Sequence, residues 1–104
     1  MKTVVLCYGL LIHQPVDYLA SWLGAHHVRV VFEQSVHGAL YVGHSIGAGR
    51  CAALASANRG TFVALDPVPP MAGPTVISAA ALGSNHLGVV NDPRSRAMIL
   101  RMAR

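Results

Sequence analysis

Charged residues are scarce in this chain of 104 residues. They make up 12% of it, and only four are acidic, whereas 53% of the residues are hydrophobic. This low charge excludes an intrinsically disordered chain and predicts strands that are buried on both faces of a sheet. No run of about 18 apolar residues occurs, so no transmembrane helix is expected. Repeats and linkers are absent too, and the length fits one domain over residues 1–104.

Cysteine is nearly absent, with only Cys7 and Cys51 present. One falls in a predicted strand and the other in a predicted helix, without the spacing of a metal site. We interpret them as two separate buried thiols of a cytoplasmic protein, because that compartment is reducing. His26 and His27 lack a third ligand at a suitable spacing, so neither a metal nor another cofactor is expected. The apolar start, residues 1–12, has no small-residue cleavage site and is interpreted as a strand rather than an export signal.

Apolar segments alternate between strand-like and helix-like patterns. Strands are predicted at 4–7, 28–32, 40–42, 62–65 and 75–79, and helices at 16–23, 46–57 and 93–103. This order predicts an α/β fold with a mostly parallel sheet of about five strands and helices on both faces. Residues 33–38 are too few for an ordinary parallel crossover, so either a helix is missing there or the flanking strands form a hairpin.

Residues 43–47, Gly-His-Ser-Ile-Gly, match the pattern G-x-S-x-G between a predicted strand and a predicted helix. A serine in this tight turn is lifted clear of the sheet, and flanking glycines avoid collisions of a Cβ atom with the turn. The N–H of Ile46, at the helix N-terminus, can stabilise an oxyanion. We therefore predict that Ser45 is a nucleophile, with a structural turn as the other interpretation. His44 is interpreted as a packing residue.

The overlapping residues 47–52 also fit the dinucleotide pattern G-x-G-x-x-A. That pattern normally lies at the first strand–helix turn, with an acidic residue about 20 positions later. Here it falls inside a helix after the third predicted strand, so a nucleotide site is the weaker interpretation.

The acid that would accompany Ser45 is found by elimination among four residues. Asp92 caps the last predicted helix and Asp17 lies in the first turn of another, which leaves Glu33 and Asp66, each at the carboxyl end of a strand. Asp66 is favoured because it follows the strand after the serine helix; an Asp-Pro turn and Glu33 as the acid remain alternatives.

His86 is the only histidine that follows Ser45 in the sequence. It lies in a loop between the last predicted strand and the last helix. In the order serine, aspartate, histidine, His86 would take the proton of Ser45 while Asp66 fixes its tautomer. An ordinary loop histidine is the other interpretation.

These segments together resemble the α/β-hydrolase superfamily. The strand and turn at 4–9 carry part of the resemblance, with Tyr8 where the family has histidine, and the serine turn at 43–47 carries another part. Residues 63–67 resemble the acid-bearing segment of pancreatic-type lipases, and residues 86–94 resemble the family's histidine loop. The resemblance implies an esterase-like, lipase-like or thioesterase-like serine hydrolase that cleaves a small carboxylic ester through an acyl-enzyme on Ser45. It also implies a second oxyanion donor near Gly9 or Leu10.

The chain is less than half as long as usual members of that superfamily, and segments for a cap domain are missing from the pattern. A small, exposed ester is therefore expected as the substrate. A hydrolase-like domain that binds a ligand without turnover is the main alternative, and a nucleotide-binding α/β protein is the lesser one. The arginines of the last helix are interpreted as a solvated face, so no nucleic-acid partner is expected, and the absence of a long apolar run predicts no membrane partner. The apolar content leaves a homo-oligomer open.

Overall fold

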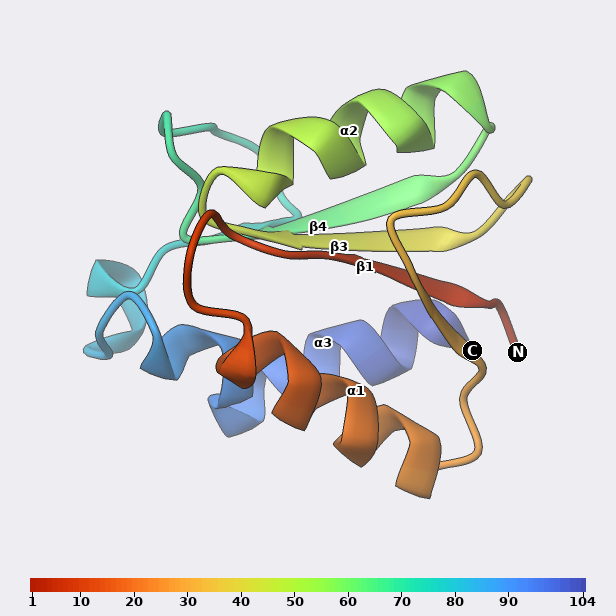
Figure 1. Cartoon of the computed structure of the whole chain (residues 1–104). Helices are drawn as coiled ribbons and strands as arrows, with labels where there is room; N and C mark the ends of the chain where they lie inside the picture. The colour runs from red at the N-terminus through yellow and green to blue at the C-terminus, as the bar shows by residue number, and fades with distance from the viewer.

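A five-stranded, all-parallel sheet forms the centre of the computed structural model, which describes all 104 residues (Figure 1). Its strands are β1 (Val4–Cys7), β2 (Val30–Phe32), β3 (Leu40–His44), β4 (Thr61–Leu65) and β5 (Val76–Ile77), in the order β2-β1-β3-β4-β5. The helices are α1 (Gln14–Ala25), α2 (Gly47–Ala57) and α3 (Pro93–Ala103), with short 3-10 helices at Ala80–Leu82 and Gly88–Asn91. The prediction of a parallel α/β fold is confirmed, with element boundaries shifted by up to two residues.

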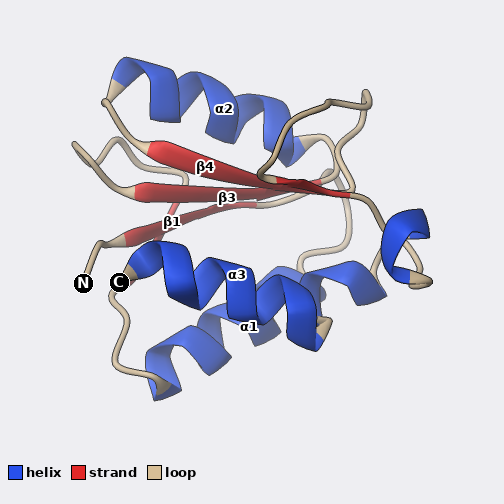
Figure 2. Ribbon diagram, turned by 180° about the vertical axis from the view of Figure 1, so that it is seen from behind, coloured by secondary structure: helices blue, strands red, loops and turns tan.

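Two apolar layers hold the helices on the sheet. Successive side chains of a strand point to opposite faces, so Val4 and Leu6 pack beneath α1 and α3 while Val5 and Cys7 pack beneath α2. Figures 1 and 2 show α2 alone on one face and α1 with α3 on the other, as predicted for helices on both faces. None of these helices has the length and apolar character needed to cross a membrane.

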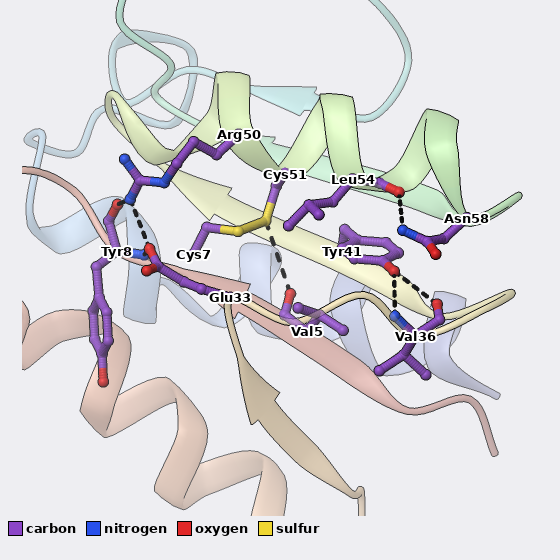
Figure 3. Close-up of a disulfide and its surroundings, with 10 residues drawn as sticks. All are labelled: Val5, Cys7, Tyr8, Glu33, Val36, Tyr41, Arg50, Cys51, Leu54 and Asn58. Carbon is purple, nitrogen blue, oxygen red and sulfur yellow. Dashed lines mark hydrogen bonds and ion pairs between the residues drawn. A yellow bond between two sulfur atoms is a disulfide. The ribbon is translucent and has the colours of Figure 1, made fainter.

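The short connection between β2 and β3 is not a hairpin. Both strands pair with β1 in parallel, one on each side, so residues 33–39 must run back over β1. Val36 in this connection packs on the α2 side; its N–H donates to the Tyr41 hydroxyl at 2.8 Å, and that hydroxyl donates to the Val36 carbonyl at 2.7 Å (Figure 3). An extended segment of this length spans a four-residue strand without a helix.

Cys7 and Cys51 form a disulfide between the end of β1 and α2 (Figure 3). The prediction of two separate thiols is therefore wrong. Cys7 lies on the α2 face of β1, and Cys51 lies on the buried side of α2, so their Cα atoms are 6.1 Å apart, within the usual range for a disulfide. The argument for a reducing compartment from these cysteines no longer holds, because disulfides persist in oxidising compartments.

The two ends of the sheet differ in what they carry. Both chain termini lie at the amino ends of the strands, and the loops that follow β1, β3 and β4 gather at the opposite end (Figure 1). Asp92 begins α3 as predicted, because its Oδ1 accepts a hydrogen bond from the N–H of Arg94 at 2.9 Å. The predicted functional residues all belong to the carboxyl end of the sheet, where ligands bind in open α/β folds.

Candidate active site

Ser45 lies in a strained turn between β3 and α2. Its φ of 59° is in the left-handed region, which non-glycine residues rarely adopt. A Cβ at Gly43 would approach the Cα of Ala48 to 2.6 Å, and a Cβ at Gly47 would approach the Tyr8 carbonyl oxygen to 2.2 Å. Both glycines of the motif are thus required by close backbone packing, as the sequence predicted.

Three side chains that are far apart in the sequence meet at this turn. The Nε2 atom of His86 lies 3.0 Å from the Oγ of Ser45, and its Nδ1 atom lies 2.5 Å from the Oδ2 of Asp66. With the Nδ1–H of His86 donating to Asp66, Nε2 is left to accept a hydrogen bond from the serine hydroxyl. The structure therefore brings together the serine, histidine and aspartate that the sequence singled out.

Asp66 is held in place from two sides. It directly follows β4 with a φ of 45°, and its Oδ1 accepts a hydrogen bond from the N–H of Ala79 at 3.1 Å. Burial alone would raise the pKa of Asp66, but the hydrogen bonds from His86 and Ala79 outweigh it and hold that pKa below its ordinary value. Asp66 is therefore an ionised acceptor that can orient an imidazole and stabilise its protonated form.

Glu33, the alternative acid, has a different role. Its carboxylate forms an ion pair with Arg50 at 2.6 Å and accepts a hydrogen bond from the N–H of Tyr8 at 3.3 Å (Figure 3). Arg50 also donates to the carbonyl of Tyr8 at 2.8 Å. The Glu33–Arg50 pair thus fixes the end of β1 beside the strained turn at Ser45, which we call the elbow. The carboxylate that contacts His86 is that of Asp66.

Tyr8 anchors the loop after β1 from the other side. Its hydroxyl donates to Asp17 at 2.5 Å, and its ring stacks on His13 with centroids 4.0 Å apart. Burial and the hydrogen bond to Asp17 raise the pKa of Tyr8 to about 12, so the phenol remains a neutral donor. Tyr8 stands where the family that this sequence resembles has histidine, and its contacts here hold the loop after β1 in place.

Three backbone N–H groups belong to residues that follow Ser45 or line the cavity with it. Those of Gly9, Leu10 and Ile46 donate to no acceptor of the chain, although Gly9 is buried and the position of its missing Cβ is 3.4 Å from the Cβ of Ser45. Free N–H groups beside a serine hydroxyl are the donors that an oxyanion needs. The sequence named the same three residues as candidate donors.

His44 is the residue whose position the sequence did not reveal. Its side chain is only 2% exposed, its Nε2 lies 2.6 Å from the carbonyl oxygen of His86, and the two rings lie 4.7 Å apart. Burial lowers the pKa of His44 against the opposing effect of this hydrogen bond, so a neutral ring donates through Nε2–H. Its Nδ1 has no partner. His44 therefore positions the loop that carries His86, a contact that no spacing pattern indicates.

A shallow cavity of about 180 Å³ opens directly over Ser45. It is lined by Gly9, Leu10, Leu11, Ile12, His44, Ser45, His86 and Leu87. Its walls are thus partly aliphatic and partly formed by the histidine–serine pair. Such a cavity can hold a short apolar group next to a nucleophile.

No protein-family model matches this sequence, and no curated protein or solved structure is detectably similar to it. Nowhere in the structure do three or more histidine, cysteine, aspartate or glutamate side chains gather in a way that could hold a metal ion. The candidate site therefore has to be judged from its own geometry.

Proposed function

We propose that this protein is a serine hydrolase of the α/β-hydrolase type that cleaves a carboxylic ester through an acyl-enzyme on Ser45. The observation that carries the proposal is the hydrogen-bonded series from Asp66 through His86 to the Oγ of Ser45. The strained elbow, which exposes the hydroxyl at the helix N-terminus, gives it further support.

The chemistry follows from these contacts. The Oγ of Ser45 attacks the ester carbonyl while Nε2 of His86 accepts its proton, and the N–H groups of Ile46 and Leu10 bind the oxyanion. When the C–O bond breaks, His86 returns that proton to the leaving alcohol. A water molecule then attacks the acyl-enzyme, His86 accepts the water proton, and Ser45 regains a proton as the carboxylic acid leaves. Asp66 keeps its negative charge throughout.

The alternatives have less support. Gly47 of the dinucleotide pattern is explained by its packing against Tyr8, and Gly49 has open space around it, so no close backbone approach requires a glycine there. A binding domain without turnover would not need an aspartate, a histidine and a serine joined in this order by hydrogen bonds.

A fluorophosphonate probe tests the proposal. It should label the protein once, at Ser45, and labelling should disappear in Ser45→Ala and slow in His86→Ala. Ser56→Ala, which removes an exposed hydroxyl of α2, is the matched control and should label like the wild type. The wild type should also hydrolyse short p-nitrophenyl esters. If folded wild-type protein is neither labelled nor active on these esters, the proposal fails and the binding domain becomes the better interpretation.

A further inference from the structure

Large apolar side chains are exposed almost exclusively around the candidate nucleophile. The protein has eight such residues, and six of them surround Ser45. We call these six the apolar rim: Leu10 (71% exposed), Leu11 (85%), Ile12 (51%), Ile46 (41%), Val68 (48%) and Leu87 (39%). An exposed apolar patch of this kind usually marks a surface that contacts something apolar.

The rim is assembled from four separate segments. The loop after β1 contributes residues 10–12, and Leu87 comes from the histidine loop; these four side chains line the cavity with Ser45. Ile46 follows the serine directly, and the N–H of Val68 donates to the serine carbonyl at 3.1 Å. Four of these side chains therefore share one opening, and the other two belong to residues joined to the serine by a peptide bond or by a backbone hydrogen bond.

The carboxylates of the protein all have partners near this surface. All four lie at the same end of the sheet as the rim: Glu33 and Asp92 form ion pairs with Arg50 and Arg94, and Asp17 and Asp66 are hydrogen-bonded to Tyr8 and His86.

Five of the six cations without an acidic partner lie at the opposite end. Lys2 and Arg29 precede β1 and β2, Arg59 precedes β4, and Arg101 and Arg104 end α3. The sixth, Arg96, lies in the first turn of α3, where it donates to Asn91 and packs over the ring of Trp22. The end that carries Ser45 is therefore apolar and poor in unpaired cations, and the far end is cationic.

We propose that the apolar rim docks on the surface of a neutral lipid layer and that the ester cleaved at Ser45 is an amphiphile presented by that layer. This inference rests on the proposed function for its chemistry and for the requirement that the cavity over Ser45 stay open. Burial of aliphatic side chains at the acyl boundary favours docking, and the six residues of the rim include no cation that would call for an anionic lipid.

The geometry disfavours a second copy of the chain as the occupant. Two protomers joined rim to rim would cover the cavity and the Ser45 hydroxyl at once. A lipid surface instead delivers an acyl chain into the cavity between residues 10–12 and Leu87. The absence of a long apolar run, on which the expectation of no membrane partner depended, bears on spanning a bilayer and not on surface docking.

Binding can be tested without catalysis in the Ser45→Ala variant. We expect this variant to sediment with phosphatidylcholine vesicles, with little change between low and high salt. Adding Leu11→Ser or Leu87→Ser should weaken binding about tenfold each, because each removes an aliphatic side chain from the buried surface. The matched control is Tyr18→Ser, which removes a side chain that is 57% exposed but lies outside the rim, and it should bind unchanged.

Three results would overturn the inference: vesicle binding that ignores the rim substitutions, binding that requires phosphatidylglycerol and disappears in high salt, or a dimer in sedimentation velocity that dissociates on Leu11→Ser. Failure of the proposed function looks different. In that case the Ser45→Ala protein still binds vesicles through the rim, but the wild type is not labelled by fluorophosphonate and releases no fatty acid from them.

Discussion

The bond between Cys7 and Cys51 should contribute a large share of the stability of this small protein. The two residues are 44 positions apart, so breaking the bond frees a long loop in the unfolded chain. The chain-entropy relation then gives about 4 kcal/mol of lost stability at 25 °C. Domains of this size have total stabilities of about 5–15 kcal/mol, so the reduced protein should be only marginally folded.

Thermal melts with and without a phosphine reductant measure this effect. The reduced protein should unfold at least about 15 °C below the oxidised protein, since 1 kcal/mol shifts the midpoint by roughly 4–8 °C in a domain of this length. The double variant Cys7→Ala/Cys51→Ala is the control. It should melt at or below the reduced wild type, because it also loses two buried side chains, and reductant should not shift it.

Two results would refute this reasoning. Titration of the denatured, unreduced protein with a thiol reagent should detect no free thiol, and two free thiols would mean that the bond does not form. If mass spectrometry shows full reduction while the melting temperature stays the same, the disulfide does not contribute to the stability of the fold.

Three further predictions concern the candidate site. Gly47→Ala should destabilise the protein by at least about 3 kcal/mol in denaturant melts, because its Cβ would collide with backbone, whereas Gly49→Ala, in open space, should stabilise it by about 0.5–1 kcal/mol. Asp66→Asn should lower kcat on p-nitrophenyl acetate about 10⁴-fold, since the tautomer of His86 is no longer fixed. Burial holds the pKa of His44 below 6.5, so at lower pH the unfolded chain binds a proton that the folded chain excludes. The free energy of unfolding should therefore fall as the pH drops below 6.5. His44→Gln should flatten that fall in pH-dependent melts.

Each of these has a result that would contradict it. A Gly47→Ala protein as stable as the wild type would show that the elbow tolerates a side chain. An Asp66→Asn protein with near-normal kcat would mean that another group orients the histidine. An unchanged pH dependence in His44→Gln would show that a different group excludes the proton.

The proximity of Ser45 and Asp66 was accessible from the sequence because each directly follows a strand of a parallel sheet, whereas His86 was chosen by its order in the chain. Once apolar strands are recognised, the residues that follow them must share one edge, whatever the strand order. The glycines at 43 and 47 added a local constraint that could also be anticipated, because only a tight turn excludes every Cβ there.

Other features depend on tertiary packing that no local pattern encodes. The disulfide requires that one alternate face of β1 meet one side of α2, and the position of β1 between β2 and β3 decides where residues 33–39 run. Similarly, Leu10 and Leu11 continue the apolar pattern of β1 in sequence, yet the chain leaves the sheet after Cys7 and exposes them.

Five of the six unpaired cations lie at the edge that bears the two termini, whereas all four carboxylates lie at the other, which gives the molecule an electric dipole along its strands. In a column of negatively charged resin, the protein should adsorb by the edge that bears its two termini. The nucleophile would then point away from the bead, and a protein immobilised by charge alone would keep its opening accessible to dissolved molecules.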